Sequence, residues 1–356
     1  MMVSSRASLA GARVPSRRGR TLLGVAVLVG LAVTLVVAIT IGSPRGGDGS
    51  LPLREAARIS LPGDTSRWDY ASLDPGRGLL FVAHLGASEV IEVDVRARRV
   101  VATIPNLPQV HGVLVVPALR RVYASATASN TVVVLDEDTG AVLRTAPTGD
   151  YPDGLAYDPR RARIWITNES GGTETVIDAA TAAVLGTVSL GGEVGNVAYD
   201  SVADQMLVAV QGRNDLAVLD PTTFAITRRV ALTGCEHGHG LALDSADRLA
   251  FVACETNATL VTVELDTWRV IATNRVGDTP DVLAWDPGLR RLYVAAEDGT
   301  VTVLDQHDRA TIVAGRGHLA GGAHVVALDP ATHHTFFPIP RGVDGRPALL
   351  DMEPVP

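Results

Sequence analysis

The chain has 356 residues and a formal net charge of −8 at pH 7. All 31 basic residues are arginine and five of them lie in the first 20 residues, so the remaining 26 face 39 acidic residues. An acidic globule of this kind repels phosphate backbones, and we therefore expect no nucleic-acid partner. Aromatic residues make up only 4% of the chain, which suits thin sheets packed through small branched side chains.

The first 54 residues divide into three segments that precede any strand pattern. Residues 1–20 are rich in arginine and are expected to be cytoplasmic. Residues 21–42 contain the apolar stretch Leu22–Gly42, which is about as long as the roughly 20 residues of a membrane-spanning helix. Because positive charge stays in the cytoplasm, this stretch predicts a single-pass cell-membrane anchor with the rest of the chain on the extracytoplasmic side. Cleavage as a signal peptide, followed by secretion, is the alternative, and residues 43–54 are expected to be a flexible linker.

A pattern of four short β-type runs recurs every 42 to 44 residues through residues 55–356. One ladder of positions marks the turn after the first run of each unit: Asp74, Val116, Asp158, Asp200, Asp244, Asp286 and Asp329. A second ladder marks the end of the third run: Asp94, Asp136, Asp178, Asp220, Glu264, Asp305 and Asp351. Four strands per repeat of this length are typical of a β-propeller. The sequence therefore predicts an all-β, seven-bladed propeller with four-stranded blades, preceded by an N-terminal transmembrane helix.

The two ends of the repeat region predict that the ring closes on itself. The last unit supplies only three strand patterns, His324–Leu328, His334–Ile339 and Ala348–Met352, and Ala56–Pro62 is a fourth-strand pattern with no unit of its own. Pairing of these N- and C-terminal strands would complete the seventh blade and remove an exposed sheet edge.

The second strand of several units carries a recognisable motif. Trp165-Ile166-Thr167-Asn168, Tyr123-Ala124-Ser125 and Tyr293-Val294-Ala295 resemble the Tyr-Val-Thr-Asn motif of the YVTN-repeat propellers, and residues 55–356 resemble the bacterial YncE-like branch of that family. The resemblance implies an extracytoplasmic seven-bladed propeller. It implies no catalytic residue, because propellers serve many unrelated functions.

One position in each unit could carry chemistry. The first strand of a propeller blade lines the central channel, and the residue five before each turn position begins that strand. These residues are Asp69, His111, Asp153, Gly195, His239, Asp281 and His324, with Asn196 directly after Gly195. Three imidazoles and three carboxylates around one channel mouth are candidate ligands for a divalent metal or a small polar molecule. The alternative is structural, because Asp at a strand start can bond nearby backbone amides.

Loops that follow the second strands, or precede the first strands, should open on the same face. They supply secondary candidates at His84, Glu169, His237, Glu255 and Glu297. A carboxylate beside a metal can act as a general base, but a glutamate on a solvated loop needs no special explanation.

Cys235 and Cys254, the two cysteines of the chain, both flank the first hairpin of the fifth unit. An oxidising outer compartment favours a disulfide between them. Simple hairpin pairing, however, sets Cys254 opposite His239 rather than near Cys235. Free thiols, or a thiolate near His237 and His239, are the alternatives.

These observations predict a membrane-anchored extracytoplasmic propeller that acts as a binding or interaction module through the mouth of its channel. Its partner would be a small polar ligand, a divalent metal or an extracytoplasmic protein. The alternative function is a metal-dependent enzyme of the lactonase or lyase type that uses the Asp/His ring. The usual lactonase set of Glu, Asn and Asp is not present at the ring positions, and the sequence leaves open whether the chain is an enzyme.

Overall fold

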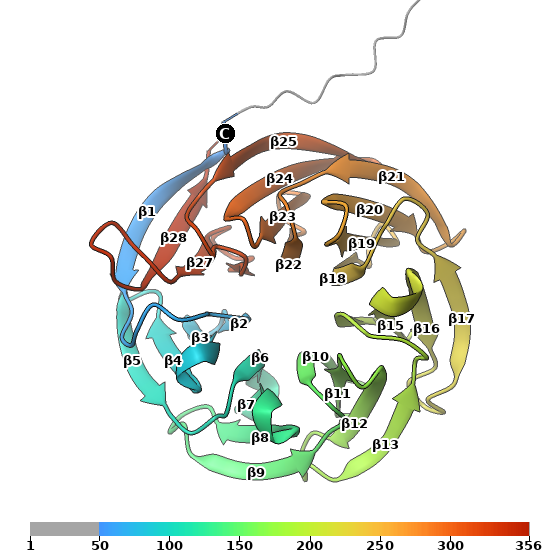
Figure 1. Ribbon diagram of the computed structural model, residues 1–356, viewed down its shortest axis with the longest axis horizontal. Coiled ribbons are helices and arrows are strands. Elements are labelled where there is room, and N and C mark those ends of the chain that lie inside the picture. The colour runs from blue at the N-terminus through green and yellow to red at the C-terminus, as the bar shows by residue number, and fades with distance from the viewer. Residues whose placement is uncertain (1–49, 356) are drawn as a thin grey trace, which may run out of the picture. The chain divides into compact units, whose positions relative to one another are not determined.

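Twenty-eight short strands follow one another along residues 50–355, the part of the chain that the computed structural model describes. They form seven four-stranded antiparallel sheets arranged around a central axis (Figure 1). The seven-bladed all-β fold is thus confirmed. The expected cytoplasmic segment and anchor, residues 1–42, lie outside the described residues. Within the described range, no helix is long and apolar enough to cross a membrane.

Each of the first six blades uses four consecutive strands, running from the channel to the rim. Blade one contains β2 (Ala71–Asp74), β3 (Leu79–His84), β4 (Glu89–Asp94) and β5 (Arg99–Ile104). Blade two contains β6 (Val110–Val116), β7 (Arg121–Ala126), β8 (Thr131–Asp136) and β9 (Val142–Pro147). Blade three contains β10 (Pro152–Asp158), β11 (Arg163–Asn168), β12 (Thr173–Asp178) and β13 (Val184–Ser189).

The other half of the ring repeats this order. Blade four contains β14 (Val197–Asp200), β15 (Gln205–Val210), β16 (Asp215–Leu219) and β17 (Ile226–Ala231). Blade five contains β18 (Gly238–Asp244), β19 (Leu249–Cys254), β20 (Thr259–Glu264) and β21 (Arg269–Arg275). Blade six contains β22 (Pro280–Asp286), β23 (Arg291–Ala296), β24 (Thr300–His307) and β25 (Ala310–His318). Four single 3-10 turns lie in the connections: η1 (Leu85–Ala87), η2 (Pro117–Leu119), η3 (Thr127–Ser129) and η4 (Gln211–Arg213).

Blade seven is assembled from both ends of the described chain. It contains β26 (Ala327–Leu328), β27 (Thr335–Ile339) and β28 (Ala348–Pro354), and β1 (Leu53–Ser60) pairs antiparallel with β28. Figure 1 shows blue β1 beside red β28 at the rim. Because Ile59 of β1 and Leu61 just after it are buried, this strand contributes to the core as well as covering a sheet edge.

The structure describes the last five residues of the predicted linker (residues 43–54), and these pack against the propeller. Leu53 and Arg54 already belong to β1, and residues 50–52 lie against β25. A side chain on Gly315 would come within 2.4 Å of the Ser50 carbonyl oxygen, and one on Gly317 within 3.0 Å of Leu51 Cβ. The strand begins earlier than predicted because the outer strand of blade six gives this segment a surface to pack against.

The hydrophobic pattern of each strand depends on whether one or both of its faces are covered by neighbouring blades. All six residues of β3 and β19 are buried, whereas β21 alternates between exposed and half-buried residues. Inner strands are covered on both faces by neighbouring blades, and outer strands face solvent at the rim. Trp165 of β11, for example, packs with Met206 and Val208 of β15 in the core between blades three and four.

The first ladder of aspartates caps the turn after each inner strand. In blade three, Asp158 Oδ1 accepts hydrogen bonds from the backbone N–H groups of Arg160 and Arg161 at 2.9 and 3.2 Å. Asp74 and Asp286 make the equivalent bonds in blades one and six. Six blades have such an aspartate, and blade two has Val116 at the same position. These turns face away from the channel mouth, so their regularity sets the blade register and leaves the opposite face free for other side chains.

Candidate metal centre at the mouth of the central channel

The seven residues predicted to ring the channel mouth do converge there, and all are shielded from solvent. The exposed fraction lies between 2% and 9% for each of them: Asp69, His111, Asp153, Asn196, His239, Asp281 and His324. Buried polar groups require partners, so the contacts of this ring show which members are satisfied by the protein itself.

Four of these side chains are turned into the channel by β-bulges. The pairing of β6 with β7 shifts register between Val110 and Val113, which leaves His111 outside the regular ladder. The same shift occurs around Asp153, His239 and Asp281 in blades three, five and six. A bulge bends its strand and re-aims the extra residue, which explains how a residue at the end of a flat blade reaches the axis.

The glycines that follow the ring residues allow neighbouring blades to approach closely. A Cβ on Gly112 would lie 2.1 Å from the carbonyl oxygen of Asp153, and a Cβ on Gly240 would lie 1.9 Å from that of Asp281. A side chain cannot be accommodated at either position. Backbone approach between blades, rather than room for a ligand, therefore explains these two glycines.

Five of the seven ring residues line a cavity of about 410 Å³, which we call the cup: Asp69, His111, Asp153, His239 and Asp281. Asn196 and His324 are not among its lining residues. Six carboxylates line the cup: Asp69, Asp153, Glu169, Glu255, Asp281 and Glu297. Its basic lining residues are Arg67, His111 and His239, and Tyr70, Gln109 and Tyr151 also line it. An enclosed surface with this excess of acid attracts cations.

Tyr70 separates the cup from the channel below. Its hydroxyl group donates to Asn196 Oδ1 at 2.9 Å and lies 3.1 Å from His239 Nε2. On the other side of Tyr70 is a chamber of about 200 Å³ lined mainly by apolar residues such as Val113, Leu241 and Val326. Asn196 thus closes the floor of the cup through Tyr70.

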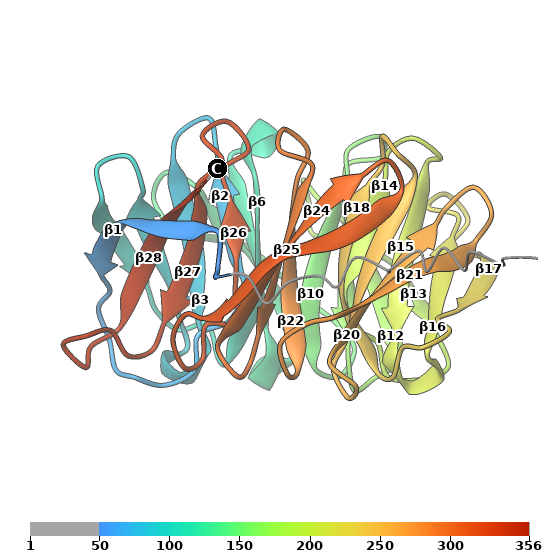
Figure 2. The same ribbon diagram turned by 90° about the horizontal axis from the view of Figure 1, so that it is seen from above.

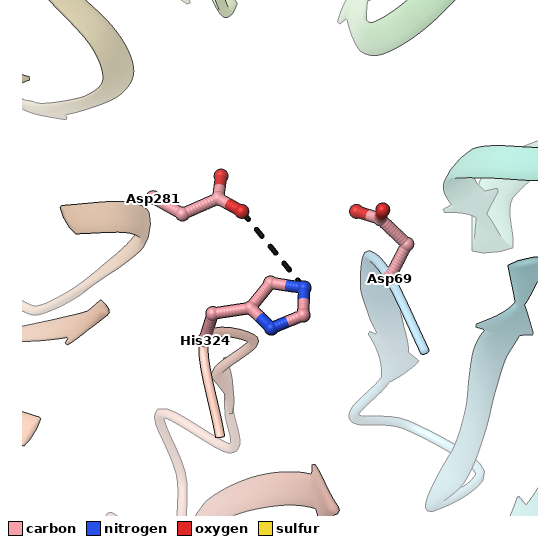
Figure 3. Close-up of side chains that lie close together, drawn as sticks. All are labelled: Asp69, Asp281 and His324. Carbon is pink, nitrogen blue, oxygen red and sulfur yellow. Dashed lines mark ion pairs between the residues drawn. The ribbon is translucent and has the colours of Figure 1, made fainter. Parts of the chain in front are cut away.

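Asp69, Asp281 and His324 form the tightest cluster at the mouth. One potential ligand atom from each lies within 4.8 Å of the other two, and all three residues are buried. Figure 3 shows a ring nitrogen of His324 placed between the two carboxylates. The dashed line in Figure 3 joins His324 Nε2 to Asp281 Oδ2, which are 3.9 Å apart.

A backbone carbonyl group fixes the tautomer of the His324 ring. Its Nδ1 lies 3.0 Å from the carbonyl oxygen of Gly322, a group that can only accept, so Nδ1 carries a proton and donates it. In the neutral ring Nε2 then presents a lone pair, and this buried atom has no hydrogen-bond partner among residues 50–355. Asp281 Oδ1 is also buried and has no hydrogen bond to any residue that the structure describes. A lone pair facing carboxylates needs a cation or a proton between them.

Arg67 partly neutralises this cluster from the solvent side. Its guanidinium group contacts Asp69 at 3.1 Å, Asp281 at 3.8 Å and Glu297 at 2.6 Å. Although burial alone would lower the pKa of Arg67, these carboxylates raise it well above its usual value. The Arg67 side chain is 44% exposed, so it can move outward without leaving a buried void.

His239 is the basic centre of the opposite side of the cup. Its Nδ1 lies 2.5 Å from the Gln211 amide, and its Nε2 lies 3.4 Å from Asp281 and 3.8 Å from Asp153. Burial would lower the pKa of His239, but Asp281, together with Glu255 and Asp153, outweighs burial and raises it. His239 in turn favours the ionised form of Asp281: burial would raise the pKa of Asp281, but His239 outweighs burial and lowers it.

His111 has a different environment from the other two ring histidines. Its Nδ1 lies 3.1 Å from the Gln109 carbonyl oxygen, and its Nε2 lies 3.1 Å from the Tyr151 hydroxyl. Burial lowers the pKa of His111. It is thus a neutral, fully hydrogen-bonded ring, consistent with the structural alternative for this position.

The secondary candidates separate into two groups. Glu169, Glu255 and Glu297 line the cup. His84 does not: it is fully buried, stacks on Trp68 with ring centroids 3.9 Å apart, and lies 3.1 Å from both Ser66 Oγ and Glu89 Oε1. His237 also stays outside the lining residues, between Glu255 at 2.7 Å and Glu193 at 3.2 Å.

Cys235 and Cys254 form a disulfide. The expectation that Cys254 pairs opposite His239 is wrong, because the bulge in β18 shifts the register and places Cys254 opposite Gly238. That shift brings the loop before β18 close to the end of β19. The disulfide therefore fixes the two segments that carry His237, His239 and Glu255.

Five residues that line the cup were not predicted from the sequence: Arg67, Tyr70, Leu85, Gln109 and Tyr151. A second periodic position would have identified three of them. Arg67, Gln109 and Tyr151 each lie two residues before a ring residue, as does His237. Gln109, Tyr151 and His237 have positive φ angles of 48°, 59° and 60°. Non-glycine residues rarely adopt this conformation, and here it turns the side chain toward the mouth. Tyr70 directly follows Asp69 and has no such signal.

A larger cavity than the cup lies elsewhere and does not resemble a site. It measures about 900 Å³ and lies beside β24, lined by charged residues that include Arg290, Arg291 and Asp305. Arg290 pairs with Asp247, and Arg291 pairs with Asp305 at 2.6 Å. These charges satisfy one another, so we place the candidate site at the cup.

Comparison with known proteins supports the fold and no more. No family model matches the sequence, and no curated protein matches it, so the YVTN-repeat resemblance stays a prediction. Among solved structures, the chain is similar to Kuenenia stuttgartiensis hydrazine synthase, with a TM-score of 0.72 and 14% identity over 82% of this chain and 97% of that one. It is also similar to a chain in the crystal structure of the mitotic checkpoint complex, with a TM-score of 0.71 and 13% identity over 93% of this chain and 99% of that one. At such low identity, both likenesses concern the propeller fold alone.

Proposed function

We propose that this chain is a binding module that holds a divalent metal ion at its channel mouth through Asp69, Asp281 and His324. The observation that carries the proposal is the buried Nε2 of His324, which has no hydrogen-bond partner in the described part of the chain and lies 3.9 Å from Asp281. Its Nδ1 is held by the Gly322 carbonyl oxygen, an arrangement that orients histidine ligands in metal sites. Two carboxylates and one imidazole suit zinc, manganese or iron.

Metal binding requires a small contraction of the cluster. Ligand atoms that now lie within 4.8 Å of one another would have to approach to about 3–3.5 Å for bonds of about 2.0–2.2 Å. The attraction between a divalent ion and two carboxylates supplies the driving force. Arg67 would release Asp69 and Asp281 and keep its 2.6 Å contact with Glu297.

We also propose that the propeller works outside the cell membrane, anchored by residues 21–42. The arginine-rich segment before that stretch supports this orientation. The Cys235–Cys254 disulfide supports it independently, since disulfides persist in oxidising extracytoplasmic compartments. Lactonase- or lyase-type catalysis would depend on the same metal, so the metal experiment tests its prerequisite as well.

The proposal is tested by calorimetric titration of the full-length chain, purified in mild detergent and stripped with EDTA, with zinc and with manganese. We expect one ion per chain. Asp281→Asn, which keeps the size of the side chain, should weaken binding by more than about 100-fold, because even second-layer partners of metal ligands are worth about 10–100-fold. The exposed His307→Gln serves as the matched control and should bind as tightly as the parent chain.

The variant Arg67→Gln should change metal affinity in the opposite direction. Removing the guanidinium leaves Asp69 and Asp281 without their competing cation, so metal affinity should rise. Thermal unfolding followed by circular dichroism verifies that each variant is folded. Equal affinity for the parent chain and Asp281→Asn, or weaker binding by Arg67→Gln, would contradict the proposal.

A further inference from the structure

The cup has two walls, and only one of them belongs to the candidate metal centre. Asp69, Asp281 and Glu297, from blades one and six, share Arg67. The other wall carries Asp153 and Glu169 from blade three and Glu255 from blade five. Within residues 50–355, no arginine comes within ion-pair distance of these three carboxylates, and their charged neighbours are His239 and His237.

This second wall contains a buried acceptor that the protein does not use. Asp153 is 3% exposed, and its Oδ1 has no hydrogen-bond partner among the described residues. The other oxygen, Oδ2, is 3.8 Å from His239 Nε2, which is too far for a hydrogen bond. Burial raises the pKa of Asp153 well above its usual value, and a cationic donor bound at Oδ1 would satisfy this oxygen and favour the ionised form.

The spacing of this wall fits an organic cation better than a second metal ion. Within residues 50–355, the set of three potential ligand atoms lying within 4.8 Å of one another is Asp69, Asp281 and His324, and it does not include this wall. Tyr151, which is 37% exposed, lines the same side and contacts His111 with ring centroids 5.0 Å apart. Dispersed carboxylates beside an aromatic ring are a typical environment for an ammonium group.

Blade four contributes no side chain at its ring position, because its backbone there approaches blade five too closely to accommodate one. Its ring position is Gly195, where a Cβ would lie 2.6 Å from the His239 backbone. Asn196, which follows, is bonded to Tyr70 at the floor. The cup volume of about 410 Å³ lies within the roughly 300–1,000 Å³ of small-molecule sites.

We propose that the wall formed by Asp153, Glu169 and Glu255 binds the ammonium group of a small organic amine. The ammonium donates to Asp153 Oδ1 and is surrounded by the carboxylates of Glu169 and Glu255, with Tyr151 covering its carbon chain. The site is separate from the metal ligands, and its occupancy does not require a metal.

The test is calorimetric titration of the full-length chain with 1,4-diaminobutane in EDTA, with 1,4-butanediol as the neutral molecule of the same length. We expect the diamine to bind and the diol to bind at least 100-fold more weakly. Asp153→Asn should reduce diamine affinity at least tenfold. Asp278→Asn, which removes an exposed carboxylate on a loop outside the cup, should leave it unchanged.

Two outcomes would overturn the proposal. Equal binding of the diamine and the diol would show that charge is not recognised, and unchanged diamine affinity in Asp153→Asn would show that this wall is not the site. EDTA is present throughout, so the amine titration does not depend on bound metal. A negative amine result therefore does not count against the metal proposal, and a negative zinc result does not count against the amine proposal. A thermal melt of Asp153→Asn equal to that of the parent chain establishes that the variant is folded.

Discussion

Single residues at the channel mouth differ mainly in whether the protein itself satisfies them. His111 has partners on both ring nitrogens, whereas His324 has one buried nitrogen that forms no hydrogen bond within residues 50–355. The two residues occupy equivalent positions in blades two and seven. Identical placement in the repeat therefore produces a structural histidine in one blade and a candidate ligand in another.

Glu174 is a buried acid far from this chemistry. It is fully buried in β12, both carboxyl oxygens are without hydrogen bonds among the described residues, and burial raises its pKa well above the usual value. By strand alternation it shares a face with Val176, which belongs to the core between blades three and four. No charged neighbour contributes to the shift, so its cause is desolvation alone.

Replacing Glu174 with methionine should stabilise the protein by about 1–3 kcal/mol at neutral pH, the cost of a buried polar group without a partner. The effect has a defined pH dependence. Because the folded-state pKa of Glu174 is raised, the parent chain is favoured most below the unfolded value of about 4.3 and loses stability as pH rises toward the folded value. The stability gap between Glu174→Met and the parent chain should therefore widen from pH 4 to pH 8.

Urea unfolding across that pH range measures the gap. The exposed Glu236→Met is the control, for which we expect a change within about 0.5 kcal/mol. A gap that stays constant with pH would mean that Glu174 is not neutral in the folded protein.

At the scale of elements, the turns were predictable from the sequence and the β-bulges were not. The Asp ladder and the strand alternation are local patterns, so they predict the blades and the ring positions closely. A bulge depends on packing against the neighbouring blade, and none was predicted. For that reason the pairing expected for Cys254 was wrong by one residue. His84 was expected at the mouth because it ends the second strand of its blade, but its ring stacks on Trp68 and does not line the cup.

The disulfide covalently joins the loop before β18 to the end of β19, at the channel-mouth end of blade five. Cys235 and Cys254 are 19 residues apart and both are buried. Replacing both with alanine should lower the free energy of unfolding by about 3 kcal/mol, as expected for a closed loop of this length. Urea unfolding of the double variant, and of the parent chain with and without dithiothreitol, measures the loss.

The same variant should keep zinc affinity, since Asp69, Asp281 and His324 belong to blades one, six and seven. It should lose affinity for 1,4-diaminobutane, because Glu255 directly follows Cys254. A stability loss below about 1 kcal/mol would be within the range of an ordinary substitution and would contradict a clamping role.

At the scale of the whole molecule, closure of the ring makes the cup possible. β1 pairs with β28, so seven blades meet around one axis and bring together residues that lie up to 255 positions apart, from Asp69 to His324. Figure 2 shows the blades side by side with their loops on two opposite faces. The repeat period predicts this convergence, whereas the contacts of Arg67 and Tyr70 arise only once the ring exists.

The most direct measurement of the central claim is anomalous diffraction from crystals grown with zinc. The account predicts one anomalous peak at the cup, about 2.0–2.2 Å from His324 Nε2 and from one carboxylate oxygen each of Asp69 and Asp281, with Arg67 turned toward Glu297. An absent peak at this position, with the Arg67 guanidinium still between Asp69 and Asp281, would contradict it.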